Sequence, residues 1–411
     1  MVGRLAQNNL WLWWVGGGLL WLYTVGHYLH GAFGYRGYGD FVLLLEAVRQ
    51  WRATGAFASD GVYLYPPLFY LLNLPLAALS NEVAITVMLI VNQFLLVACL
   101  SLLAQALAPR PGWRLWLWVL LPVALNFRPL LLLLSMAKIE LAQLTLLLGA
   151  LVVFQRGRSW LTGSLVACSG MLKPLPLVLV GYWAWKRQWR VVAGWLLTIA
   201  VCVTVAGTVF GFQAVGSYFF NVALPRGENL SPLYWYENQS LLGVAARLFH
   251  PVQPNQFSVY LIQRPADALL GWGLRLALLL WLGVLLRPGR PMSRERVAGE
   301  WSVTITGMLL LSPFSRDYYA VFLMPAYLLL AHALVRREGG WRSPAGWCGV
   351  LSYLMVGQGF PLGIIRRLPS LIPGIDNFHA YLHYGIPTAG YLLLIMAWAC
   401  YLREAGGLTG D

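Results

Sequence analysis

The chain has 411 residues, of which 59% are hydrophobic and only 11% are charged. Soluble domains carry about 25% charged residues, so this composition excludes a soluble protein and indicates a single membrane-embedded domain over residues 1–411. The net charge of +14 comes from Lys and Arg in short groups between apolar runs, a pattern that favours contact with anionic membrane lipids and argues against nucleic-acid binding.

Apolar runs follow one another along the whole chain. A crossing needs about 20 apolar residues, or fewer where a helix stops short of the far side. The first run is too long for the apolar part of a signal peptide and ends without a cleavage site, so we predict an uncleaved helix. The predicted fold is an all-α polytopic membrane protein with about twelve transmembrane helices. Their expected ranges are 10–30, 83–107, 114–127, 139–155, 160–172, 174–185, 190–212, 265–287, 299–313, 318–336, 345–365 and 380–402.

Basic residues gather on one side of these predicted helices. The positive-inside rule makes that side the cytoplasm and places both termini there. Residues 66–80 are also apolar, but a crossing at that point would put every later basic group outside, so we predict a short segment in or dipping into the outer leaflet. The basic groups are Arg4, Arg110/Arg114, Arg156/Arg158, Lys186/Arg187/Arg190, Arg287/Arg290/Arg294/Arg296, Arg336/Arg337/Arg342 and Arg403.

Two long connections, 31–82 and 213–264, lie on the non-cytoplasmic side of this topology, and both are expected to carry amphipathic helices. All cytoplasmic loops are short, so the chemistry is expected at the periplasmic or extracytoplasmic face of the cell membrane. Ten of the fifteen acids fall on that side, namely Asp40, Glu46, Asp60, Glu82, Glu140, Glu228, Glu237, Asp267, Asp317 and Asp376.

The first outer connection contains GYGDFVLLLEAVRQW, which begins at Gly37. Apolar side chains recur there at helical spacing, so we predict an amphipathic helix that opens at Asp40 and lies on the membrane surface with its apolar face toward lipid. An Asp just before a helix commonly caps its first turn, and a carboxylate fixed there is also well placed as a general base. Tyr65-Pro66-Pro67 then redirects the chain toward the membrane.

Residues 156–190 have basic groups at both ends, which requires an even number of crossings in a stretch with only about 26 apolar residues. Two such short helices rise about 20 Å each, less than the bilayer core of about 30 Å. Their junction, Lys173-Pro174, is therefore expected below the outer surface. A cation there is costly. Either it pairs with a neighbouring acid, or it binds a phosphate in a cavity open to the outside, and we favour the phosphate.

A second hairpin, formed by the predicted helices 114–127 and 139–155, repeats this arrangement. Its outer segment runs from Asn126 to Glu140 and carries Arg128 and Lys138, which could join Lys173. Lys138 could equally form a structural ion pair with Glu140, and the sequence leaves both possibilities open.

Several chemical motifs are absent from the sequence. It contains no D-x-D for a metal-bound nucleotide diphosphate, no P-loop, no GxGxxG and no H-E-x-x-H. The five cysteines lie in apolar runs and are expected to be small buried hydrophobes. His379 and His383 follow Asp376, but two histidines without a convincing third ligand more often make ordinary contacts. We therefore expect no metal.

Five short motifs follow one another on the predicted outer side. They are GYGDF at Asp40, Tyr65-Pro66-Pro67, Leu172-Lys173-Pro174, ENQSL from Glu237 with the Arg-bearing GVAARLF after it, and LLSPFSRDYY at 310–319. In this order the chain resembles glycosyltransferase family 87, the polyprenyl-phosphate-mannose-dependent α-mannosyltransferases of the GT-C membrane superfold. It departs from the family at Lys138 and Glu140, where a Gly-Gln-x-Asn-like segment is common, and at Tyr318, where His is common.

The resemblance implies an inverting transfer of a sugar, mannose first, from a polyprenyl-phosphate donor to an acceptor glycolipid or glycan. Asp40 would be the catalytic base, and the departing phosphate would need positive charge around it. We expect Lys173, Arg128 and Arg316 to supply that charge. No cofactor is expected beyond the lipid-linked donor. Further substrate contacts are expected from Lys138, Glu140, Tyr65, Asn238, Gln239, Asp317 and Tyr318.

Two other functions fit parts of the pattern. A transporter or lipid flippase would place paired ionisable groups near mid-membrane in weakly repeated halves, but no repeat is visible and the acids cluster at outer helix ends. A related enzyme could use another lipid-linked sugar, such as polyprenyl-phosphate-arabinose. The sequence gives no indication of an oligomeric state.

Overall fold

The computed structural model describes residues 39–55, 57, 65–107, 124–223, 235–248, 265–289, 292–357 and 377–407, together with six positions between 15 and 26. Within these residues the regular structure is helical, apart from one isolated β-bridge. The predicted all-α class is thereby confirmed for the described part of the chain. The predicted helix 114–127 lies mostly outside it.

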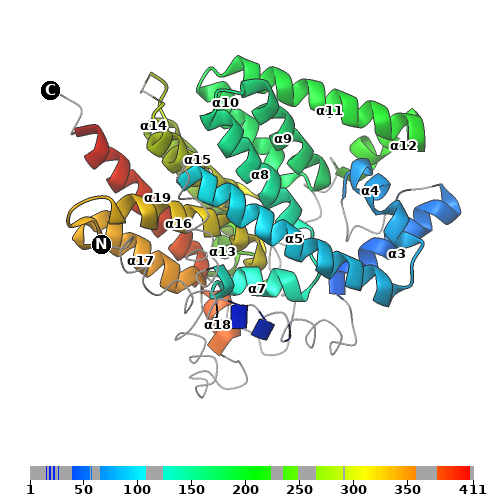
Figure 1. Cartoon of the computed structure of the whole chain (residues 1–411), viewed down its shortest axis with the longest axis horizontal. Coiled ribbons are helices and arrows are strands. Elements are labelled where there is room, and N and C mark those ends of the chain that lie inside the picture. Colours follow the sequence, from blue (N-terminus) through cyan, green and yellow to red (C-terminus); the bar gives the residue numbers. More distant parts are fainter. Residues whose placement is uncertain are drawn as a thin grey trace.

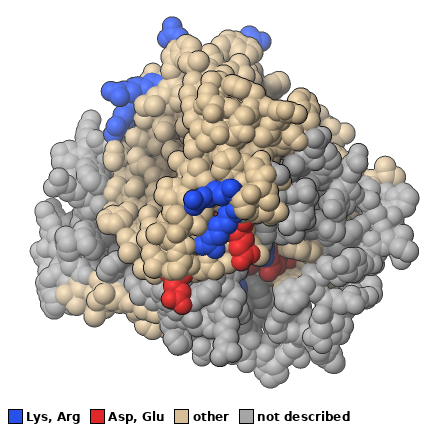
Figure 2. Space-filling view, turned by 90° about the vertical axis from the view of Figure 1, so that its right-hand side faces the viewer, with Lys and Arg blue, Asp and Glu red and all other residues tan. Residues whose placement is uncertain are grey.

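Four of the described helices are long and apolar enough to cross a membrane, and shorter apolar helices accompany them. Figure 2 shows one face on which the coloured residues are mostly uncharged, with Lys, Arg, Asp and Glu confined to small groups. Such a surface suits contact with lipid, where exposed charges are costly. A membrane protein is therefore confirmed, while the number of twelve crossings stays a prediction. The four helices are Asn81–Leu107, Trp189–Phe210, Asp317–Val335 and Ile386–Glu404.

At the top of Figure 1, α8, α9 and α11 pack side by side, α5 packs on α8, and α3 and α4 lie at the right. The helix α4 has 11 residues and rises only about 16 Å, too little to cross a bilayer core. The elements are α3 (Gly39–Thr54), α4 (Pro67–Ala77), α5 (Asn81–Leu107), α7 (Arg128–Ser135), α8 (Glu140–Gln155), α9 (Ser159–Leu172), the 3₁₀-helix η1 (Leu175–Leu179), α10 (Val180–Trp185), α11 (Trp189–Phe210), α12 (Phe212–Ser217) and the π-helix η2 (Tyr218–Ala223).

The second half packs α15 and α17 against α19, with α13 against α14. Its elements are α13 (Leu241–Leu248), α14 (Pro265–Leu285), α15 (Arg294–Leu311), the 3₁₀-helix η5 (Asp317–Leu323), α16 (Met324–Val335), the short 3₁₀-helix η6 (Gly340–Arg342), α17 (Pro344–Gly357), α18 (Asn377–His383) and α19 (Ile386–Gly407).

Helices α9 and α11 touch at two glycines. A Cβ atom on Gly163 would lie 2.0 Å from the Val191 carbonyl oxygen, and one on Gly194 would lie 2.3 Å from the Trp160 carbonyl oxygen. The two backbones approach so closely that no larger residue fits, as is common between membrane helices. Because Lys173 directly follows α9, this contact fixes the position from which its side chain extends.

Gly163→Ala is therefore expected to lower the thermal unfolding midpoint of the detergent-solubilised protein. Overpacking typically costs about 1–3 kcal/mol, and here the atoms in the way are backbone atoms that cannot rotate aside. Gly181→Ala in α10 is the matched control, because a Cβ there would meet no other atom within 4 Å. Equal thermal unfolding midpoints for the two variants would show that α9 and α11 can move apart without loss of stability.

The helix predicted at Asp40 is present as α3, but its apolar face has a different partner from the predicted one. Phe41, Leu44 and Leu45 are buried and pack in one core with residues of α4, α5 and the connection between α7 and α8. Arg49 ties the helix further, by hydrogen bonds to the end of α4 and the start of α5. Protein and not lipid covers the apolar face, so the predicted lipid contact is wrong.

The last predicted helix, 380–402, is interrupted and forms α18 and α19. Gly385 lies between them with φ of +67°, a conformation that residues with a side chain rarely adopt. A Cβ on Gly385 would also lie 2.6 Å from the Val244 side chain, so α13 approaches the turn closely. A second difference is α7, which forms within the predicted outer segment 126–140 and has Pro129 near its start, where proline is well tolerated.

The predicted helix 318–336 begins as the tighter 3₁₀-helix η5 and continues as α16. Packing against α7, α8, α15 and α16 places η5 at the centre of the molecule. In a 3₁₀-helix, side chains three positions apart share a direction while intervening ones point elsewhere. Asp317 therefore points in a different direction from Tyr318 and Tyr319, which both lie near Lys173.

Candidate active site

The junction between α9 and η1 carries Lys173 in an extended conformation, with φ of −158° and ψ of 132°. Pro174 follows, so the predicted break between two short helices is confirmed. The Lys173 Nζ lies 2.6 Å from Oε1 of Glu140, the first residue of α8. The side chains are 16% and 1% exposed, so this ion pair is largely removed from solvent. We considered two partners for Lys173, a neighbouring acid and a phosphate, and in this structure it pairs with the acid Glu140.

Tyrosine rings surround the cations. Lys173 Nζ lies 4.4 Å from the centroid of the Tyr319 ring and 5.4 Å from that of Tyr65. Lys138 Nζ lies 4.7 Å from the centroid of Tyr318, a distance at which a ring attracts a cation. Lys138 lies just before α8 and Lys173 just after α9, so the two lysines flank the α8–α9 hairpin in the sequence. The tyrosines come from η5 and from just before α4. Four distant stretches of sequence thus meet at one place.

Arg316, the residue just before η5, is the third cation of this group. Its guanidinium carbon lies 5.1 Å from the centroid of Tyr318, and the guanidinium forms an ion pair with Glu237. Asn238 and Arg316 also form the isolated antiparallel bridge. The segment containing Glu237 is therefore attached to the cation group by both side chain and backbone. We call Lys138, Glu140, Lys173, Glu237, Arg316 and Tyr318 the cation cluster.

Residues 235–240 are held in place by their own side chains. Asn238 Oδ1 accepts a hydrogen bond from the Ser315 backbone N–H at 2.9 Å, and Asn238 Nδ2 donates to the Pro313 carbonyl at 3.1 Å. Gln239 Nε2 donates to the Leu382 carbonyl at 2.9 Å. Asn238 and Gln239, predicted to contact the substrate, thus form the frame behind the cluster in this structure.

Two further residues complete this frame: Arg247, which the sequence analysis noted in GVAARLF without a role, and Thr388, which it missed. Arg247 in α13 is fully buried and donates to the carbonyl oxygens of Trp235 and Asn238 at 2.6 and 2.7 Å. Thr388 in α19 donates from Oγ1 to the Gln239 carbonyl at 2.8 Å. An arginine on an otherwise apolar helical stretch was a visible signal for Arg247, whereas nothing local distinguished Thr388.

The cluster holds more positive than negative charge. Three cations, Lys138, Lys173 and Arg316, face two carboxylates, Glu140 and Glu237, so the described residues leave an excess of one positive charge. Burial is the largest influence on the pKa of the Lys138 ammonium and holds it well below the ordinary value. An additional anion would oppose this effect of burial and favour the charged form of Lys138.

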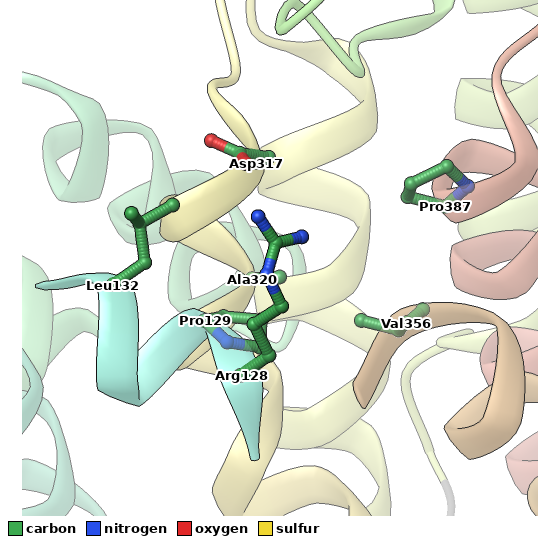
Figure 3. Close-up of a pocket in the computed structure, with 7 residues that line it drawn as sticks. All are labelled: Arg128, Pro129, Leu132, Asp317, Ala320, Val356 and Pro387. Atoms are coloured by element: carbon green, nitrogen blue, oxygen red, sulfur yellow. The ribbon is translucent and has the colours of Figure 1, made fainter. Parts of the chain in front are cut away.

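A small pocket lies beside the cluster, on another side of η5. Figure 3 shows the Arg128 side chain rising from α7 toward the segment that bears Asp317, with apolar side chains around it. Both residues were predicted as substrate contacts, and the structure brings them to this pocket together. The other lining residues are Pro129, Leu132, Ala320, Val356 and Pro387.

The predicted base, Asp40, lies in the first turn of α3, and its side chain is outside the described residues. The adjacent Phe41 is buried in the same core as Tyr65, Ala137 and Ile139, and Leu172 packs against that core. Ala137 and Ile139 flank Lys138, so the start of α3 shares a core with the neighbours of the cation cluster.

Among the residues that the structure describes, no three His, Cys, Asp or Glu side chains lie close enough together to hold a metal ion. Asp376 and the His379 side chain fall outside that set, and His383 is buried. The role of this histidine pair is therefore not tested.

Comparison with known proteins identifies the family. The model of glycosyltransferase family 87 matches residues 63–313, which is more than half of the chain. The chain belongs to glycosyltransferase family 87. This confirms the family that the motifs predicted, and it supports the predicted class of enzyme.

Two curated relatives carry related names. A polyprenol-phosphate-mannose-dependent alpha-(1-2)-phosphatidylinositol pentamannoside mannosyltransferase of Mycolicibacterium smegmatis is 28% identical over 220 residues, which cover 52% of this chain and 47% of that protein. A polyprenol-phosphate-mannose-dependent alpha-(1-2)-phosphatidylinositol mannoside mannosyltransferase of Mycobacterium tuberculosis is 25% identical over 370 residues, which cover 82% of this chain and 79% of that protein. The chain thus spans about half of the first relative and most of the second.

The family 87 match includes much of the cation cluster. Lys138, Glu140, Lys173 and Glu237 lie inside it, and Arg316 lies three residues beyond its end. Asp40 precedes the match, so its predicted role as base rests on its position in the predicted first outer connection and on the packing of α3 near the cluster.

Proposed function

We propose that this chain transfers mannose from polyprenyl-phosphate-mannose to a hydroxyl group of a glycolipid acceptor at the non-cytoplasmic face, with inversion at the anomeric carbon. Family membership and the names of both relatives support the donor and the class of acceptor. Three cations converge around Tyr318, and one of them, Lys173, lies at the break between two short apolar helices. This convergence is the observation that carries the proposal.

In the proposed reaction the donor's phosphate occupies the cation cluster. As the bond between the anomeric carbon and the phosphate oxygen breaks, negative charge grows on the phosphate, and Lys173, Lys138 and Arg316 stabilise it. These ammonium and guanidinium groups are fixed before the reaction by ion pairs and tyrosine rings, so little reorganisation is needed when the charge develops.

Glu140 has a second task in this proposal. Its Oε1 holds Lys173, while its buried Oε2 has no hydrogen-bond partner among the described residues. A buried acceptor without a donor is costly, and a sugar hydroxyl near the phosphate would satisfy it. Asp40 would take the proton of the acceptor hydroxyl as that oxygen attacks the anomeric carbon from the face opposite the phosphate.

The proposal is tested with purified protein in lipid nanodiscs, supplied with polyprenyl-phosphate-mannose and a phosphatidylinositol mannoside fraction. We expect acceptor-dependent release of polyprenyl phosphate and an acceptor product enlarged by one mannose. Polyprenyl-phosphate-arabinose is assayed in parallel, and faster turnover with it would reassign the sugar. Movement of the lipid across proteoliposome membranes without cleavage of either donor would replace the proposal by transport.

A further inference from the structure

The η5 helix presents two different polar environments on different sides. Tyr318 and Tyr319 lie against the cations Lys138 and Lys173. Asp317 and Ala320, three positions apart, both line the pocket that contains Arg128, as the repeat of a 3₁₀-helix requires. One short segment therefore separates the cation cluster from a second polar site.

The second site offers groups that suit a sugar hydroxyl. The Asp317 carboxylate can accept hydrogen bonds from hydroxyl groups and the Arg128 guanidinium can donate to their oxygens. Tyr391 in α19 is one turn beyond the lining residue Pro387, and the Asp317 carboxylate acts on it electrostatically. Its hydroxyl is buried and has no hydrogen-bond partner among the described residues.

The position of the second site relative to the cation cluster indicates which substrate it binds. The donor's sugar is covalently bonded to its phosphate, so a phosphate in the cation cluster places that sugar directly beside the cluster, where Lys138, Lys173 and Glu140 lie. A polar site on another side of the same segment is then left for the other substrate. Arg128, predicted as a phosphate contact, would in this arrangement contact the acceptor.

We propose that the pocket between Arg128 and Asp317 binds hydroxyl groups of the acceptor's sugar. This inference rests on the proposed function and adds the location of the acceptor. The pocket has room for about one water-sized group, so it takes hydroxyls at the edge of a sugar ring and not a whole ring. Its apolar lining by Leu132 and Val356 faces the carbon skeleton that carries them.

The test uses Arg128→Gln and Asp317→Asn, with octyl α-mannoside as the acceptor and polyprenyl-phosphate-mannose as the donor. Each variant is expected to raise the acceptor KM by about 10- to 100-fold, the effect of losing hydrogen bonds to a charged group. The donor KM and the binding of polyprenyl phosphate are expected to change less than threefold, on the order of the scatter between such measurements. Matched controls are Arg342→Gln and Glu338→Gln, which alter exposed residues and should leave both KM values unchanged.

A raised donor KM with an unchanged acceptor KM would overturn the inference and return Arg128 to the phosphate. Asp317→Glu keeps the charge and serves if Asp317→Asn does not fold, because a longer carboxylate in a small pocket should still raise the acceptor KM. Failure of the proposed function appears differently, as wild-type protein that releases no polyprenyl phosphate with any acceptor. In that case binding of octyl α-mannoside to wild type and to Asp317→Asn still decides whether the pocket holds a sugar.

Discussion

Asp40→Asn is expected to reduce sugar transfer by about 10²–10⁴-fold while leaving donor binding intact, since that is the usual contribution of a general base. An amide has nearly the size of a carboxylate but cannot accept the proton of the acceptor hydroxyl. Helix α3 should persist, because it is held by its buried apolar face and by Arg49, and neither depends on Asp40.

Glu46→Gln is the matched control for that experiment, as Glu46 is an exposed acid on the same helix. Single-turnover measurements with saturating donor separate the chemical step from binding. Wild-type turnover of Asp40→Asn would remove Asp40 from the mechanism. Glu140 and Glu237 are the carboxylates of the cation cluster, and they would then be tested as the base.

Lys173→Met is expected to have the second large effect, with losses of donor affinity and of turnover by about 10²–10³-fold, as when one charged or hydrogen-bonding group is removed from a developing anion. The same change leaves Glu140 buried beside an apolar side chain, and breaking a buried ion pair costs about 3–5 kcal/mol of stability. Activity loss alone would therefore not distinguish phosphate binding from misfolding.

The double variant Lys173→Met/Glu140→Gln makes that distinction. It removes both charges of the pair, so the thermal unfolding midpoint should recover relative to the single variant, while donor affinity should stay low. Recovery of both properties would mean that Lys173 serves only to neutralise Glu140. A single variant with wild-type donor affinity would contradict the phosphate role directly.

Much of the architecture could be predicted because its causes are local. A proline after Lys173 and two short apolar runs were enough to place the break between α9 and η1. Residues 66–80 were predicted not to cross because a crossing there would put every later basic group outside. The basic groups predicted an orientation of the chain, because their distribution can also be read directly from the sequence. For Lys173 the sequence allowed a neighbouring acid although we favoured a phosphate, and Glu140, the acid that it pairs with, was predicted as an ion-pair partner only of Lys138.

The remaining features depend on contacts between distant residues. The apolar face of α3 had the composition of a lipid-facing surface, and only tertiary packing put protein against it. The turn at Gly385 looked like part of a continuous apolar helix, although its positive φ and the close approach of Val244 both favour glycine there. Thr388 offers no local signal at all, because its partner lies 149 positions earlier in the chain.

That long-range hydrogen bond also bears on how the protein is made. Gln239 finds acceptor and donor partners on α18 and α19, and Arg247 has a partner there as well, so residues 235–240 lack these anchors until the final helices have left the ribosome and inserted. During synthesis Lys138, Lys173 and Arg316 all precede α18 and α19, which supply these tethers. A nascent chain halted after α17 would hold every described charge of the cluster without these tethers, so completion of the reaction centre coincides with insertion of the last helix.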